Sequence, residues 1–171
     1  MTGGGADVTG GVVLWTLVLA GLVLLAYVGM LRGWRRRARR HDLAPLTPAG
    51  TPERALLEAE GRYFGSTTAG RWLDRIVARG LGTRSPARLV LSEQALDVQR
   101  PGDGFRIAAD AVEGARHDQG IAGKVVPPHG VLVVTWRHGT HRIDSGFRLA
   151  DSSTHEQWVS SLSRLAKEQH A

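Results

Sequence analysis

Residues 12–31 most strongly limit what this chain can fold into. They read VVLWTLVLAGLVLLAYVGML, twenty consecutive residues without a charged side chain. A helix of that length covers about 30 Å, which matches the hydrocarbon thickness of a bilayer. A helix buried in a soluble domain seldom stays apolar on every face for so long. The sequence therefore predicts a transmembrane helix at 12–31.

The residues on either side of this stretch predict its orientation. Residues 1–11 contain Asp7 and no Lys or Arg, whereas a basic cluster follows the stretch: Arg32, Arg35, Arg36, Arg37, Arg39 and Arg40. Positive flanks stay on the cytoplasmic side of a membrane. We therefore expect a single-pass inner-membrane protein with an extracytoplasmic tail at 1–11 and a cytoplasmic C-terminal domain. A cleavable signal peptide would carry its basic residues before a shorter apolar run, so the helix is expected to remain as an anchor.

The charge of the chain argues against nucleic acid as a partner. The formal net charge is +6, and the six arginines of the basic cluster account for all of it. The rest of the chain is balanced, whereas nucleic-acid binders carry a basic surface. The cluster itself suits anionic lipid headgroups. Gly29 and Gly33 have the spacing that allows close helix pairing, so a homodimer through the span is a further possibility.

Two soluble segments are expected after the helix. Residues 32–52 combine the basic cluster with a proline-rich stretch that contains Pro45, Pro48 and Pro52. Closely spaced prolines disfavour helix, which predicts an extended tether. Residues 53–171 have room for one domain of ordinary size.

The pattern of this domain is mainly β. Runs of alternating or β-branched and aromatic residues predict short strands, separated by Gly- and Pro-containing turns. The expected strands are 58–68, 87–92, 95–100, 104–108, 112–118, 131–136 and 141–149. The segment 131–136 is apolar or Thr throughout, as expected of a strand covered on both faces. The segment 141–149 alternates, so one of its faces is expected to meet the core.

Two segments suggest helices. In 71–79, Trp72, Leu73, Ile76 and Val77 have the spacing of a short amphipathic helix, although Gly80 and Gly82 also allow a bent, twisted strand.

The last segment of the domain has the stronger helical pattern. Ser153 and Glu156 fit a capping box. An apolar stripe follows it: Trp158, Val159, Leu162, Leu165 and Ala166. We expect this helix to plug one end of the sheet core rather than to lie on a membrane.

A meander of about seven strands closed by a C-terminal amphipathic helix is the order of elements in a pleckstrin-homology-like (PH-like) barrel. Several short segments strengthen the resemblance: 63–68 (YFGSTT), 72–76 (WLDRI), 80–82 (GLG), 122–125 (AGKV) and 146–148 (GFR). Together with the anchor they resemble a family of actinobacterial membrane-anchored proteins with a PH-like domain, sometimes labelled export proteins or transporters. The resemblance implies a fold of α+β, mainly-β class and a membrane address, and it implies no catalytic residues.

No constellation for catalysis or for a cofactor is evident. His138 and His141 flank a predicted turn, and His117 and His129 lie elsewhere, so solvated histidines are expected rather than a metal site. The chain has no cysteine, no G-x-S-x-G elbow and no phosphate-binding loop motif. We therefore expect no enzyme activity, no cofactor and no metal. Asp74 with Arg75, and Asp144 with Arg148, are expected to form surface ion pairs.

The strongest candidate contacts are basic residues between the first two strands: Arg71, Arg75, Arg79, Arg84 and Arg88. In eukaryotic PH domains the loop after the first strand often supplies basic residues that hold lipid phosphates, and the planar guanidinium suits phosphate. This analogy makes the five arginines possible phosphate or lipid contacts, against the simpler interpretation of a solvated basic rim.

Three functions remain open. The first is a membrane-tethered, non-enzymatic interaction module that binds a protein partner through a sheet edge or loops, or an anionic lipid. The second is an accessory or structural subunit of a membrane transport or envelope complex that makes contact through the span. The third is an enzyme with an unrecognised site.

Overall fold

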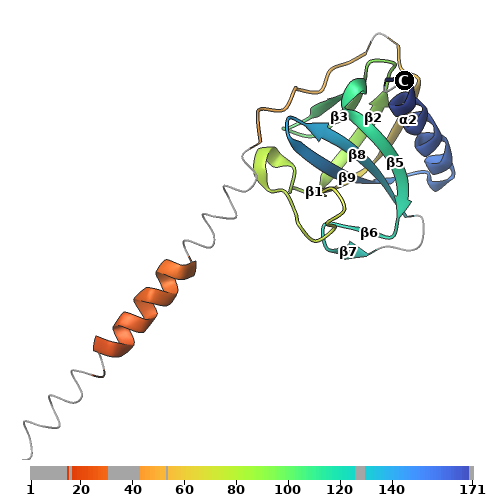
Figure 1. Cartoon of the computed structure of the whole chain (residues 1–171). Helices are drawn as coiled ribbons and strands as arrows, with labels where there is room; N and C mark the ends of the chain where they lie inside the picture. Colours follow the sequence, from red (N-terminus) through yellow and green to blue (C-terminus); the bar gives the residue numbers. More distant parts are fainter. Residues whose placement is uncertain (1–14, 16, 31–42, 53, 126–129, 170–171) are drawn as a thin grey trace, which may run out of the picture. The chain divides into compact units, whose positions relative to one another are not determined.

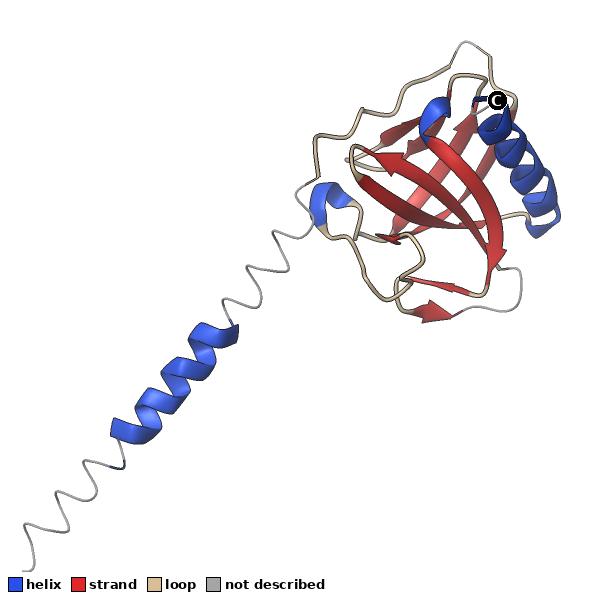
Figure 2. Ribbon diagram, in the orientation of Figure 1, coloured by secondary structure: helices blue, strands red, loops and turns tan. Residues whose placement is uncertain are grey.

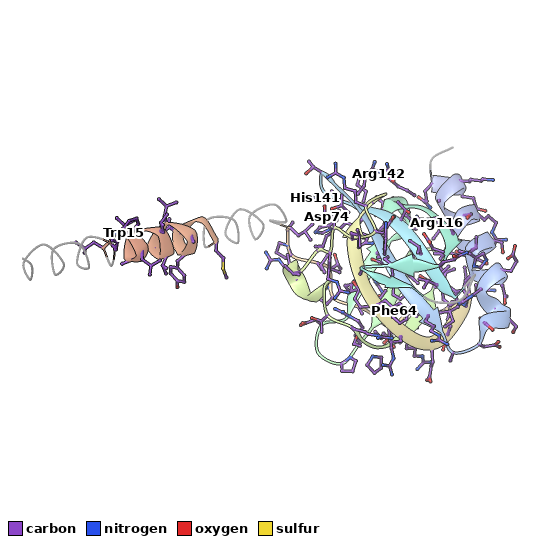
Figure 3. The ribbon with its side chains drawn as sticks, turned by 90° about the horizontal axis from the view of Figure 1, so that it is seen from below. Trp15, Phe64, Asp74, Arg116, His141 and Arg142 are labelled. Atoms are coloured by element: carbon purple, nitrogen blue, oxygen red, sulfur yellow. The ribbon has the colours of Figure 1, made fainter. Side chains whose placement is uncertain are left out.

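The computed structural model describes residues 15, 17–30, 43–52, 54–125 and 130–169. The chain divides into two units, Met1–Arg40 and His41–Ala171. In the first unit, residues 15 and 17–30 are helical, and their large hydrophobic side chains, Trp15 among them, are exposed (Figure 3). Within the described residues, no helix is both long enough and apolar enough to cross a membrane.

The expected span at 12–31 extends beyond the described residues at both ends, and it stays a prediction. The expected tail at 1–11, Gly33 and the arginines between 32 and 40 lie outside the described residues.

The second unit is built on a seven-stranded antiparallel sheet that curls into a barrel (Figure 1). Its strands are β1 (Leu57–Thr68), β2 (Ser85–Leu91), β3 (Ala95–Gln99), β4 (Phe105–Ala108), β5 (Val112–Asp118), β8 (Val131–His138) and β9 (His141–Leu149). Their order across the sheet is β4-β3-β2-β1-β9-β8-β5. A small separate hairpin joins β6 (Gly120–Ile121) to β7 (Lys124–Val125). The expected strands are thus confirmed, and β5 pairs with β8 rather than with β4.

Short 3-10 turns connect several of these strands, and one long helix ends the domain (Figure 2). The turns are η1 (Ala78–Gly80), η2 (Ala109–Ala111) and η3 (Ser152–Thr154), and the helix is α2 (His155–Gln169). The turn η2 redirects the chain after β4. As a result, β4 and β5 lie at opposite edges of the sheet.

The strand β1 is the centre of the sheet and bends in its middle. It pairs with β2 up to Tyr63 and with β9 from Gly61 onward, with a register shift between Tyr63 and Gly65. Gly65 has φ +127°, a conformation that a residue with a Cβ rarely adopts. The shift lets consecutive aromatic residues serve two cores, because Tyr63 packs in the main core while Phe64 packs in a second cluster.

The second cluster explains why β8 and the middle of β1 carry apolar residues on both faces. Phe64 packs there with Ile121 of the small hairpin and with Val131 and Val133 of β8. The expectation that β8 is covered on both faces is confirmed, since Val131 to Val134 are all buried. The expectation that one face of β9 meets the core is confirmed by Ile143, Phe147 and Leu149. The other face is also covered in the middle of the strand, where 143–147 are buried throughout.

The helix α2 packs chiefly against β5 and closes the barrel, as its stripe predicted. Trp158, Leu162, Leu165 and Ala166 are buried in the main core. The predicted capping box differs from the structure. Asp151 accepts a hydrogen bond from the backbone N–H of Ser153 and so caps η3, which leads into α2.

The proline-rich stretch is extended as expected, but the part that is described is docked along the barrel rather than free. Leu43 is buried in the main core, and the N–H of Arg106 donates to the carbonyl oxygen of Thr47 (2.8 Å). The buried Asp97 carboxylate accepts from the N–H of Gly50 (2.7 Å) and from the Arg106 guanidinium (2.8 and 2.9 Å). A buried carboxylate needs such donors, so it holds this segment in place. The domain therefore includes residues that the sequence assigned to the tether.

Candidate interaction surface

The loop that joins β1 to β2 is not the short helix that its spacing suggested. The backbone N–H of Thr68 donates to the carbonyl of Asp74 (3.0 Å), and the N–H of Ile76 donates to the carbonyl of Ser66 (2.9 Å). The N–H of Ser66 donates to the carbonyl of Leu81 (2.8 Å). The loop thus runs back beside the end of β1, where β2 no longer pairs with it. If 71–79 formed a helix, its backbone N–H and C=O groups would bond to each other. They would then not be available for these bonds to β1.

The apolar residues of this loop divide into two groups. Ile76 and Leu81 are buried and anchor the loop to the main core. Trp72, Leu73 and Val77 are 48%, 68% and 67% exposed, and we call them the apolar loop patch. All three lie within the six residues 72–77 of one loop. Exposed hydrophobic residues concentrated in this way can mark a binding site, whereas ones scattered singly need no explanation. Among the described residues of the second unit, the other large hydrophobic residue with such exposure is Leu56.

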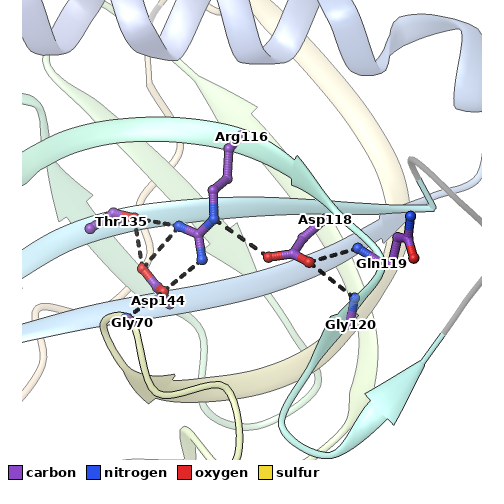
Figure 4. A network of polar contacts seen from close by, with 7 residues as sticks. All are labelled: Gly70, Arg116, Asp118, Gln119, Gly120, Thr135 and Asp144. Carbon is purple, nitrogen blue, oxygen red and sulfur yellow. Dashed lines mark hydrogen bonds and ion pairs between the residues drawn. The ribbon is translucent and has the colours of Figure 1, made fainter.

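An ionic network centred on the buried Asp144 holds the start of the loop (Figure 4). The Asp144 carboxylate accepts from Thr135 Oγ1 (2.6 Å), from Arg116 Nη2 (2.8 Å) and from the backbone N–H of Gly70 (3.2 Å). Arg116 also lies 3.5 Å from the Asp118 carboxylate. The expected pair of Asp144 with Arg148 is wrong, because Asp144 points into this network. A pocket of about 340 Å³ lies between the network and Trp72.

The network sets the protonation of its carboxylate. Burial by itself raises the pKa of Asp144, since a charged group loses hydration. The hydrogen bonds from Arg116, Thr135 and Gly70 outweigh burial, so the pKa of Asp144 lies below its ordinary value. Asp144 is therefore ionised at neutral pH, and its charge ties β9 to the loop at Gly70.

A second buried network braces the other end of the loop. The Tyr63 hydroxyl donates to the carbonyl of Leu81 (2.8 Å) and lies 2.7 Å from Ser66 Oγ. Ser66 Oγ lies 2.6 Å from Ser145 Oγ, which accepts from Trp136 Nε1 (2.9 Å). Burial raises the pKa of the Tyr63 hydroxyl, so it remains a donor at all ordinary pH values. No sequence motif indicated either network.

The five arginines proposed as phosphate contacts lie in three different settings. Arg71 is exposed next to the apolar loop patch. Arg75 donates to the carbonyls of Gly82 (3.0 Å) and Ala122 (2.7 Å), and Arg79 donates to the carbonyl of Leu43 (3.0 Å). These two side chains brace the loop instead of presenting their charge to one ligand.

The other two arginines lie farther along the chain. Arg84 stacks over the Phe64 ring at 4.4 Å, and Arg88 pairs with Glu58. Both line a hollow over β1, β2 and β9. The loop and the hollow therefore divide the five arginines between them, and the role of each as a phosphate contact stays a prediction.

The remaining polar candidates have structural partners. His117 Nε2 lies 3.1 Å from Glu156, and His138 Nε2 lies 3.1 Å from the carbonyl oxygen of Ala44. The described residues contain no group of three or more side chains placed to hold a metal ion, and His129 lies outside them. The Asp74 carboxylate accepts from Thr68 Oγ1 (2.9 Å), whereas the Arg75 guanidinium donates to backbone carbonyls.

The fold has counterparts among solved structures. A chain in "The 8S snRNP Assembly Intermediate" is similar, with a TM-score of 0.50 and 11% identity over 71% of this chain and 90% of that chain. The C-terminal domain of an unknown protein from Leishmania infantum has a TM-score of 0.44 and 11% identity, covering 67% of this chain and 84% of that one. The DH/PH domains of p115-RhoGEF give 0.41 and 11%, covering 67% and 30%. At 11% identity, the similarity to the first of these chains shows the fold alone.

A match at the level of sequence families agrees with the fold. No curated protein matches the chain. Residues 42–163 match the family described as Bacterial PH domain-like, which covers the barrel and most of α2. The matched region also takes in the docked proline-rich stretch. The PH-like domain expected from the sequence is confirmed, and the chain belongs to the bacterial PH domain-like family.

Proposed function

We propose that this protein is a non-enzymatic interaction module that binds a protein partner through the apolar loop patch. The observation that carries the proposal is the exposure of Trp72, Leu73 and Val77 on one loop of an otherwise well-buried domain. Aromatic residues dominate the binding energy of protein interfaces, and Trp is the most enriched of them. The patch thus has the composition of an interface centre.

The bracing of the loop supports the same proposal. Gly70 is bonded to Asp144 at one end, and Leu81 is bonded to Tyr63 at the other. Between them, Ile76 is buried and its N–H is bonded to β1. A loop fixed before binding loses less conformational entropy when a partner arrives. The exposed side chains are therefore presented on a preorganised support.

The proposed setting of the module is the cytoplasmic face of the cell membrane. The uncharged stretch 12–31 and the arginines that follow it support this setting. A reporter fused after Ala171 should remain inside the cell, and the chain should stay with the membrane in a carbonate wash. A reporter outside the cell, or release by carbonate, would contradict the tether without touching the patch.

Affinity capture from solubilised membranes tests the proposed interface. The tagged full chain should retain a partner in stoichiometric amount, and Leu73→Ser should reduce the captured amount by roughly tenfold, as expected for an interface centre. Leu56→Ser is the matched control, because it removes an exposed leucine from another part of the same domain. Equal capture by the two variants would contradict the proposal.

Two alternatives give different results in the same experiment. Arg71, exposed beside Trp72, favours an anionic lipid surface as a second candidate, since a basic residue next to an exposed tryptophan suits a membrane interface. In that case Leu73→Ser lowers binding to vesicles of mixed phosphatidylcholine and phosphatidylglycerol, and protein capture stays unchanged. An accessory subunit of a membrane complex would instead lose its partner when 12–31 is replaced by an unrelated span.

A further inference from the structure

A hollow of about 840 Å³ lies over β1, β2 and β9, beside the turn that follows β3. Five arginines line it, from four separate segments of the chain, and one acidic residue joins them. These residues are Arg62, Arg84, Arg88, Arg100, Arg148 and Glu60, and we call the site the arginine hollow. None of the residues of the apolar loop patch lines it, so it is a separate feature of the surface.

The arrangement of two of these arginines is unfavourable in the protein alone. Arg62 of β1 and Arg148 of β9 are direct cross-strand partners, and both are exposed. Within the described residues, neither guanidinium has a hydrogen bond or an ion pair. Like charges directly opposite each other on a sheet destabilise it. A pair of neutral polar residues at these two positions is therefore expected to be more favourable than the two arginines.

For two more arginines, no carboxylate lies within ion-pair distance among the described residues. Arg84 lies over the Phe64 ring, and Arg100 lies over the Tyr63 ring at 4.6 Å. Arg100 also donates to the carbonyls of Gly80 (3.2 Å) and Asp103 (3.1 Å). Rings and carbonyls orient a guanidinium without neutralising it. These contacts hold both cations in place at the rim of the hollow.

The remaining arginine has a counter-ion. Arg88 pairs with Glu58, and Glu60 is its partner residue across the strands. The hollow as a whole therefore gathers more cations than carboxylates. A ligand with concentrated negative charge would relieve the repulsion between Arg62 and Arg148 and would be held by the fixed arginines.

We propose that the arginine hollow binds a terminal phosphate group, as found in a phosphomonoester or a diphosphate. A phosphomonoester carries nearly two negative charges on one small centre, and its oxygens match the fork of a guanidinium. A carboxylate carries one charge, so it would leave most of the hollow uncompensated. The inference does not depend on the proposed protein interface, because the two sites share no residue.

Titration of the full chain, solubilised in a neutral maltoside detergent, tests this site with inorganic pyrophosphate as the probe. Arg62→Gln with Arg148→Gln should weaken pyrophosphate binding by roughly tenfold or more, since two charge-assisted contacts are lost. Arg137→Gln is the control, because Arg137 is exposed on β8 and does not line the hollow, and it should bind as the wild type does. Glu60→Gln should bind a few-fold more tightly, because it removes the one carboxylate that lines the hollow. This gain of binding cannot come from a folding defect.

Thermal melting of the same proteins provides a second readout. Without ligand, the double glutamine variant should melt at or above the temperature of the wild type, because like-charge repulsion is removed. Pyrophosphate should raise the melting temperature of the wild type and not that of the double variant. Equal binding by the double variant and the wild type would overturn the proposal.

Two further probes identify the source of the phosphate group. Tighter binding of dihexanoyl phosphatidate than of pyrophosphate would assign a lipid headgroup, and the reverse order would assign a soluble phosphate. Either order supports the site if the double variant loses binding of both ligands. An octaglutamate peptide that binds as tightly as pyrophosphate would overturn the proposal in favour of an acidic peptide. The outcome is independent of Leu73→Ser, so failure here and failure of the protein interface are distinguishable.

Discussion

Two segments of this domain have the apolar spacing of an amphipathic helix, and each contains a tryptophan. In α2, Trp158 is 1% exposed and packs in the main core. In the loop after β1, Trp72 is 48% exposed and its neighbours Leu73 and Val77 are more exposed still. Nearly the same pattern thus produces a buried helix in one place and an exposed loop in the other.

The difference shows what each set of apolar residues serves. The apolar stripe of α2 packs over the open end of the barrel and keeps water away from the main core. Of its large apolar residues, the loop contributes Ile76 and Leu81 to that core. Its other large apolar residues bury little surface in the domain, so their presence favours a role in recognition.

The largest expected effect comes from the buried tryptophan. Trp158→Ala should lower the free energy of unfolding by about 3–5 kcal/mol, because it removes a large buried side chain and leaves a cavity. Chemical denaturation of the full chain, followed by far-UV circular dichroism, measures the loss. A change as small as that of an exposed residue would mean that α2 does not close the barrel.

Releasing the loop at Gly70 should have a smaller effect. Asp144→Ala removes the acceptor of Gly70, Thr135 and Arg116, and we expect a loss of about 1–3 kcal/mol in the free energy of unfolding. Hydrogen exchange of the Gly70 amide should become faster by roughly tenfold or more, as a lost bond of this strength implies. Thr83→Ala, in the same connection but outside the network, should leave that amide unchanged.

Acid should reproduce part of this effect. The pKa of Asp144 in the folded protein lies below its ordinary value, so the stabilisation is fully present above the unfolded pKa of about 3.9. It is lost as the pH falls from there through the folded pKa. The free energy of unfolding should therefore fall less steeply with acid in Asp144→Ala than in the wild type, below about pH 4. Parallel curves would show that Asp144 does not gain its charge-assisted bonds on folding.

The smallest expected effect on stability, and the largest on function, comes from the exposed tryptophan. Trp72→Ser should change the free energy of unfolding by less than about 0.5 kcal/mol, as is usual for surface positions. It should nevertheless reduce partner capture as Leu73→Ser does. A clear loss of stability would show that the patch belongs to the core, and the comparison of the two segments would fail.

The sequence predicted the parts of the fold that depend on local pattern. The alternation in 87–108, the apolar run of β8 and the stripe of α2 each follow from a period of two or of 3.6 residues. Docking of the proline-rich stretch was not predictable in this way, because it depends on Asp97 and Leu43 meeting partners distant in sequence. The loop was misassigned for the same reason, since its backbone bonds to β1 are tertiary contacts.

The candidate sites were less predictable than the fold. Arg71 to Arg88 appeared as one basic run, yet the backbone separates them into loop braces and lining of the hollow. The sequence pattern assigned no role to Arg62 or Arg100 and predicted an ion pair with Asp144 for Arg148, because only the strand register brings Arg62 opposite Arg148. The pattern of Asp144 suggested solvent, whereas the second apolar cluster and Arg116 cover that face of β9.

Site-specific photocrosslinking in native membranes tests the central claim most directly. A benzophenone side chain placed at residue 73 of the full chain should give one discrete adduct with a partner protein, and the same group at residue 56 should give none. Trp72→Ser should abolish the adduct at 73. Equal adducts from both positions, or none from 73 while the protein is folded and membrane-bound, would contradict the account.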